Sequence, residues 1–132
     1  MAIRWTHITA TVSDLQQSID FYTSYCNLRL IKDRRQEGGS TIWLGPEPGE
    51  GEDATFVLVL TKGKVTNCLR HLGFQCESRA QVDAIAAEAE RHGILVEPPT
   101  FIGGSVGYFT VIQDPDGHQV EFTYGQPLKG LA

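Results

Sequence analysis

Two histidines and one glutamate, His7, His71 and Glu121, have the residue types and spacing to hold a metal ion. His7 and His71 lie 71 − 7 = 64 residues apart, each early in a strand-like run, and Glu121 lies in a third such run. Two imidazoles and a carboxylate can bind a divalent metal on one side and leave its other positions to water or substrate. A metal held in this way polarises a substrate oxygen and stabilises the anion that forms.

Side-chain alternation places these three residues on comparable faces. Successive side chains of a strand point to opposite sides of the sheet. In residues 5–12, 71–76 and 118–124, apolar side chains alternate with a second set of mostly polar or small ones. The second set comprises Trp5, His7, Thr9, Thr11, His71, Gly73, Gln75, Gln119, Glu121 and Thr123. We expect this set to face away from the helices that cover the apolar side.

Four members of the second set, Thr9, Gln75, Gln119 and Thr123, are candidates for positions beside the metal. The threonines, like Gly73, are small enough to leave room for a substrate. The glutamine amides can orient a substrate oxygen without competing strongly for the ion. No residue is singled out as a nucleophile.

Each residue also has an ordinary explanation when it is taken alone. Single histidines are common structural or surface residues, and half-exposed antiparallel strands routinely carry a charge such as Glu121. Joint placement on equivalent faces of a repeated unit favours the metal site, because titratable groups then converge in one concavity. We expect His92, at a helix end, and His118, after a turn, to have surface roles. Trp5 and Trp43 are expected to pack rather than to stack on a substrate.

The elements that would position these residues form an internal repeat, the signature of a duplicated structural unit. The first copy has a strand at residues 5–12 and a helix that starts at a capping box from Ser13 to Gln16. One face of this helix carries Leu15, Ile19, Tyr22 and Cys26. The later strands are expected at residues 28–32, 40–44 and 54–61, with a Gly-, Pro- and Glu-rich loop at 45–53.

The second copy repeats this order. Its strand at residues 71–76 leads to a helix that starts at a capping box from Ser78 to Gln81 and ends at Gly93. Further strands are expected around Val96, at 108–113 and at 118–124, with a turn at 114–117. Each unit then lays one helix on one face of a four-stranded sheet, so we expect function on the other, concave face.

Four segments of the repeat are similar to one known family. They read HITATVSDL at residues 7–15, SIDFY at 18–22, HLGFQC at 71–76 and DPDGHQVEF at 114–122. On these segments the chain resembles the vicinal oxygen chelate superfamily, which includes glyoxalase I, extradiol dioxygenases, methylmalonyl-CoA epimerase, fosfomycin-modifying enzymes and bleomycin-binding proteins. The resemblance covers nearly the whole chain.

The resemblance implies an α+β fold in which two tandem βαβββ modules form an incompletely closed mixed β-barrel with the helices outside. Residues 1–132 would then be one domain, with module one at about 1–62, a linker at about 62–70 and module two at about 71–126. The family's ligands on the first, fifth and eighth strands match His7, His71 and Glu121.

One position departs from the glyoxalase I-like and epimerase-like members, whose fourth strand supplies a further Glu or Gln ligand. Here that strand reads TFVLVLT at residues 55–61, and the matching position is Val59. An apolar side chain cannot bind such a cation. The expected three-ligand site is more like those of the extradiol dioxygenases and the fosfomycin thiol transferases.

Composition excludes several classes of protein. Eleven basic and sixteen acidic residues give a net charge of −5, so the surface should repel phosphate backbones, and no nucleic-acid partner is expected. The three cysteines lack CxxC spacing and are expected to be reduced. The N-terminus lacks a basic and apolar leader, and no apolar run approaches membrane-spanning length, which predicts a cytoplasmic protein without a membrane partner.

These features predict a metalloenzyme of the glyoxalase or extradiol dioxygenase type that binds one divalent ion of Fe, Mn, Ni, Co or Zn. Its small-molecule substrate would chelate the metal through adjacent oxygens, in a dioxygenase, lyase, isomerase or thiol-transferase reaction. A homodimer is expected, with each metal site inside one chain or shared between subunits. The alternative is a protein that binds a drug or other small molecule, metal-free or metal-assisted, as bleomycin- and fosfomycin-resistance relatives do.

Overall fold

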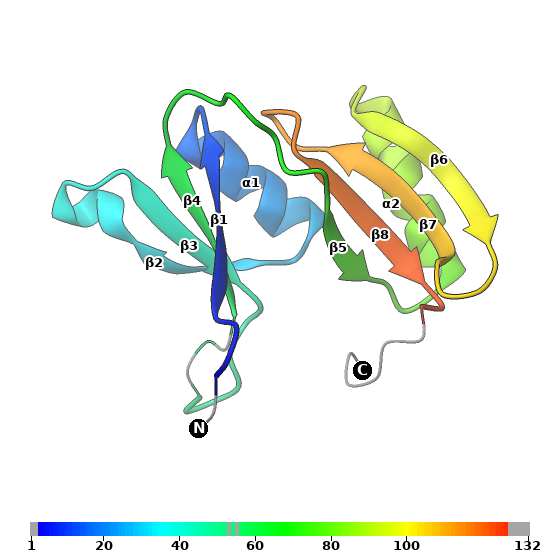
Figure 1. Ribbon diagram of the computed structural model, residues 1–132, viewed down its shortest axis with the longest axis horizontal. Helices are drawn as coiled ribbons and strands as arrows, with labels where there is room; N and C mark the ends of the chain where they lie inside the picture. The colour runs from blue at the N-terminus through cyan, green and yellow to red at the C-terminus, as the bar shows by residue number, and fades with distance from the viewer. Residues whose placement is uncertain (1–2, 53, 55, 127–132) are drawn as a thin grey trace. The chain divides into compact units, whose positions relative to one another are not determined.

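The computed structural model describes residues 3–52, 54 and 56–126. The chain divides into two compact units, Met1–Cys68 and Leu69–Ala132. Each described unit runs in the order strand, helix and three strands (Figure 1). The α+β class and the duplicated βαβββ order predicted from the sequence are therefore confirmed, and the sheet of each unit is open rather than closed on itself.

The first unit forms a mixed sheet with the strand order β1-β4-β3-β2. Its elements are β1 (His7–Val12), α1 (Leu15–Tyr25), β2 (Arg29–Asp33), the short 3₁₀ helix η1 (Arg34–Glu37), β3 (Thr41–Gly45) and β4 (Val57–Lys62). β1 runs parallel to β4, and the other neighbours are antiparallel. β1 and β2 are thus the opposite edges of this sheet.

Helix α1 lies against one face of this sheet (Figure 1). Its predicted apolar stripe is buried at Leu15, Ile19 and Tyr22, while Cys26 forms the half-buried C-cap. The sheet side chains buried with them are Ala10, Val12, Ile42, Leu44, Leu58 and Leu60. Alternation then sends the neighbouring positions of β1, β3 and β4 to the uncovered face.

The predicted capping box at the start of α1 is wrong by one residue. The N-cap is Asp14, whose Oδ1 accepts the backbone N–H of Gln17 at 2.9 Å. Gln16 instead donates from Nε2 to Asp20 Oδ1 at 2.9 Å. Ser13 and Asp14 are both good capping residues, and the charged carboxylate gains more from the helix dipole. Asp53 and Thr55, within the predicted loop and fourth strand, lie outside the described residues.

The second unit repeats the arrangement, with the strand order β5-β8-β7-β6 and β5 parallel to β8. Its elements are β5 (Leu72–Gln75), α2 (Arg79–Arg91), β6 (Leu95–Ile102), β7 (Gly107–Gln113) and β8 (Gln119–Tyr124). The predicted cap of α2 is confirmed, because Ser78 Oγ accepts the N–H of Gln81 at 3.1 Å. The helix ends before Gly93, whose φ of +72° needs the freedom of glycine.

Across the described residues, we find no helix with the length and apolar character needed to span a membrane.

Candidate functional site

His7 opens β1 and lies on the sheet face that α1 does not cover. Its side chain is exposed, and its Nδ1 forms a 2.9 Å hydrogen bond with the Thr6 hydroxyl. A hydrogen bond to one ring nitrogen fixes the orientation of an imidazole and leaves the other nitrogen to a ligand. The local geometry therefore suits His7 to a metal bond through Nε2.

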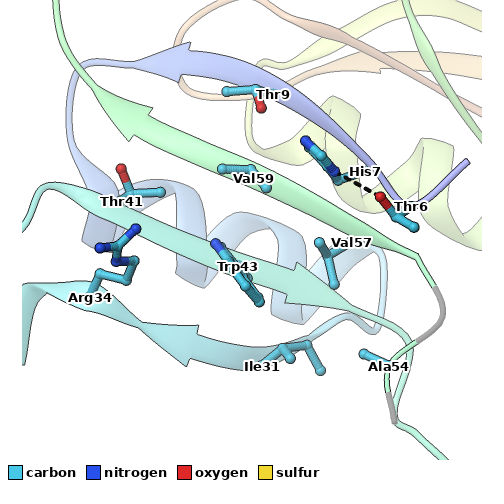
Figure 2. Close-up of a pocket in the computed structure, with 10 residues that line it drawn as sticks. All are labelled: Thr6, His7, Thr9, Ile31, Arg34, Thr41, Trp43, Ala54, Val57 and Val59. Carbon is cyan, nitrogen blue, oxygen red and sulfur yellow. Dashed lines mark hydrogen bonds between the residues drawn. The ribbon is translucent and has the colours of Figure 1, made fainter.

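A pocket of about 600 Å³ opens beside His7 on this face of the first unit (Figure 2). This volume falls in the usual range for small-molecule sites. Its lining residues are Thr6, His7, Thr9, Ile31, Arg34, Thr41, Trp43, Ala54, Val57 and Val59. Thr9, a predicted neighbour of the metal, is thus part of the pocket wall.

Val59 lies in the middle of this wall. It pairs with Thr9 on one side and with Trp43 on the other, so the three side chains form one row across the sheet. The isopropyl group supplies no ligand atom, and it contributes apolar surface to the pocket instead. The position that departs from the family pattern is therefore a packing surface for whatever occupies the pocket.

Sequence reasoning missed most of the pocket lining. Trp43, expected to pack, is half-buried on the pocket face, and Trp5 is 74% exposed with its ring edge-on to Phe56 at 5.3 Å. The alternation of Thr41 and Trp43 with the buried Ile42 was the available signal. No sequence signal placed Arg34 at the pocket, because it follows β2 in a short 3₁₀ turn that lacks strand periodicity.

His71 and Glu121 come together in the second unit. Glu121 on β8 pairs with Gly73 on β5, and His71 lies two residues before Gly73 on the same side of the strand. The distance from His71 Nε2 to Glu121 Oε2 is 3.8 Å. Adjacent donors on a metal with bonds of about 2.1 Å lie about 3 Å apart, so small side-chain rotations suffice.

Exposure differs between these two side chains. His71 is 48% exposed, whereas Glu121 is only 16% exposed. A half-exposed imidazole beside a largely buried carboxylate can exchange this weak contact for a shared cation. Within either unit, the described residues contain no cluster of three or more His, Cys, Asp or Glu side chains that could hold a metal.

The remaining predicted neighbours of the metal differ in accessibility. Gln75 and Gln119 are exposed, so their amides are accessible. Thr123 is buried, with an exposed fraction of 2%, and pairs with Gln75 across β5 and β8. It therefore packs in the sheet rather than leaving open space.

The expectation that His118 has a surface role is wrong. Its side chain is 1% exposed, and its Nδ1 accepts the backbone N–H of Leu69 at 2.8 Å. The backbone N–H of His118 donates to Asp114 Oδ1 at 2.9 Å, and Asp114 lies in the predicted turn. The partner of the ring is 49 residues away in sequence, so local pattern could not reveal it. His92 does lie at the surface, 3.3 Å from Glu88.

The duplicated βαβββ order is the fold order of the vicinal oxygen chelate class of protein. The sequence profile of the Glyoxalase/Bleomycin resistance protein/Dioxygenase superfamily matches residues 4–122. The chain belongs to this superfamily, which confirms the resemblance drawn from the four sequence segments.

Two curated relatives match along most of their length. The chain is 38% identical over 126 residues to an uncharacterised protein of Pseudomonas aeruginosa, covering 93% of this chain and 89% of that protein. It is 23% identical over 124 residues to lactoylglutathione lyase of Escherichia coli O157:H7, covering 90% of each.

Solved structures show the same fold. A possible glyoxalase from Bacillus cereus is 28% identical, with a TM-score of 0.70 over 92% of this chain and 99% of that one. A mutant of the fosfomycin resistance protein FosX from Listeria monocytogenes, in complex with Mn(II) and 1S,2S-dihydroxypropylphosphonic acid, is 20% identical. Its TM-score is 0.76 over 96% of this chain and 95% of that one.

Proposed function

We propose that the chain is a metal-dependent enzyme of the glyoxalase and dioxygenase type, acting on a small substrate that chelates a divalent ion through adjacent oxygens. The observation that carries the proposal is the 3.8 Å approach of His71 Nε2 to Glu121 Oε2. His71 directly precedes β5 and Glu121 lies on the neighbouring strand β8, and both present ligand atoms that suit Fe, Mn, Ni, Co or Zn. Membership of the superfamily supports the same reading.

In this proposal His7 is the third ligand. The Thr6 hydroxyl orients the His7 ring through its bond to Nδ1. The bound ion supplies Lewis acidity, which polarises a substrate oxygen. Val59 keeps a fourth protein ligand out of the site, and Thr9 borders the pocket beside His7.

Three protein ligands would leave open positions on a divalent ion for a substrate that chelates through adjacent oxygens. Manganese is the first ion to test, because the FosX complex from Listeria monocytogenes contains Mn(II). A second function, metal-free binding of a small molecule, is favoured by one observation. The pocket on the first unit has a ligand-sized volume and a largely apolar wall.

Metal analysis of the purified protein tests the proposal. We expect about one divalent ion per three-ligand site in the wild type, and a sharp loss in His71→Ala and Glu121→Ala. His92→Ala is the matched control, because it removes a surface imidazole outside the site. Full stoichiometric metal in His71→Ala refutes the ligand assignment. The small-molecule binding function would be favoured by two results together. The wild-type protein would be purified without metal, and after metal is added it would bind neither catechol nor hydroxamate.

A further inference from the structure

The pocket on the first unit has a cationic group at the edge remote from His7. His7 opens β1, and Arg34 directly follows β2, the opposite edge strand of the sheet. Three strand spacings separate these edges, roughly 14 Å. Figure 2 shows Arg34 and His7 at opposite ends of the pocket, with Trp43 and Val59 between them.

The charge at the Arg34 end is not fully neutralised by its neighbours. Arg34 Nε lies 3.5 Å from Glu37 Oε2, and the same carboxylate lies 3.8 Å from Lys32 Nζ. Two cations therefore share one carboxylate. The Arg34 side chain is 53% exposed, so its other N–H groups can reach an incoming ligand, and a guanidinium is well shaped to hold an oxyanion by two parallel hydrogen bonds.

The middle of the pocket is apolar. Ile31, Trp43, Val57 and Val59 contribute side chains from β2, β3 and β4 to its wall. The indole ring of Trp43 offers a flat surface on which a planar or aliphatic group packs well. The lining thus changes along its length from the His7 imidazole and two hydroxyls, through apolar groups, to the Arg34 guanidinium with the Thr41 hydroxyl beside it (Figure 2).

We infer that this pocket binds a substrate with an apolar body and an anionic oxygen group, a carboxylate or a phosphonate, which pairs with Arg34. The inference rests on the proposed function in one respect, that the metal-chelating oxygens lie at the His7 end. It adds a substrate class, an anionic chelator whose negative group is separated from the chelating oxygens by an apolar spacer. Arg34 is then a specificity-determining residue that contributes nothing to metal binding.

Titration calorimetry on the manganese-loaded protein tests this class. The probes are benzohydroxamic acid and its 4-carboxy and 4-phosphono derivatives, which share one chelating group and differ in charge. For an exposed ion pair, we expect at least one anionic probe to bind about fivefold more tightly than the neutral one. Arg34→Gln should abolish this preference without changing metal content. Arg91→Gln, a matched loss of charge on α2, should keep it.

A second pair of probes separates this inference from the proposed function. 2-Naphthoate and 2-naphthylmethanol carry no hydroxamate and are titrated into metal-free protein, so a difference between their affinities does not depend on a metal. Tighter binding of naphthoate that disappears in Arg34→Gln supports an anion-binding role for the Arg34 end of the pocket, even if the protein binds no metal. Equal affinity for the charged and neutral members of both pairs in the wild type overturns the inference, whereas loss of metal binding alone overturns only the metalloenzyme.

Discussion

His118 should matter more for stability than a typical histidine after a turn, and His118→Leu tests this. Leucine fills a similar volume but cannot accept the Leu69 N–H, which His118 Nδ1 binds at 2.8 Å. A buried donor without an acceptor costs about 1–3 kcal/mol. At about 3 °C per kcal/mol for a chain of this length, the melting temperature should fall by roughly 6 °C.

The same substitution should weaken metal binding, because Leu69 lies two residues before His71. Both backbone groups of Leu69 are held where β8 begins, the N–H by the His118 ring and the carbonyl by the backbone N–H of Gln119 at 3.4 Å. In the proposed metal site His118 would be a positioning residue, and its loss should lower manganese affinity by about tenfold, as for residues that orient ligands.

Thermal unfolding followed by circular dichroism, with manganese titration below the transition, measures both effects. His118→Asn keeps an acceptor near Nδ1 and should recover metal affinity more than stability, because it leaves a cavity. His92→Leu is the matched surface control and should change the melting temperature little. If His118→Leu matched the wild type in both measurements, the buried hydrogen bond would not perform the role given to it.

Three further outcomes are expected. Asp14→Ala should destabilise the protein by about 1 kcal/mol in urea unfolding, because its Oδ1 accepts the Gln17 N–H at the N-cap of α1; an unchanged stability would contradict this. At pH 8, Ellman's reagent should label the exposed Cys68 quickly and Cys76 slowly, because burial raises the pKa of the Cys76 thiol and keeps it protonated; comparable rates would be inconsistent with that burial. Light scattering at micromolar concentration should give the mass of a homodimer, and a strictly monomeric mass would exclude it.

The fold was predictable because the same periodic pattern occurs twice. The alternation in β1 and the one-face spacing in α1 each specify a buried side, and the duplicated order specifies how the strands connect. The cap of α1 was mispredicted because Ser13 and Asp14 are nearly equivalent capping residues. Only the interaction of the Asp14 carboxylate with the helix dipole favours one over the other. The cap of α2 was predictable, since Ser78 has only Glu77 and Arg79 as neighbours, and neither is a favoured capping residue.

The pocket was harder to predict than the candidate ligands. Histidines and carboxylates attract notice as residue types, whereas Trp43, Val57 and Val59 become a pocket wall only when β3 and β4 are paired in register. Arg34 depends in addition on a 3₁₀ turn, capped by Asp33 and ended by Gly38, that has no periodic signature. Long-range pairing, rather than local propensity, assembles this face.

The second unit links its turn chemistry to its candidate ligand positions. A one-residue slip of β8 against its neighbours would turn Glu121 to the helix-covered face, because side chains alternate strictly along a strand. The turn at residues 114–117 opposes such a slip, with Asp114 Oδ1 accepting the N–H groups of Asp116 and His118 at 2.9 Å each. His118 then holds Leu69, two residues before His71. The turn thus fixes the register of the strand that carries Glu121, and His118 fixes the backbone just before His71. Neither the turn nor His118 contributes a ligand atom.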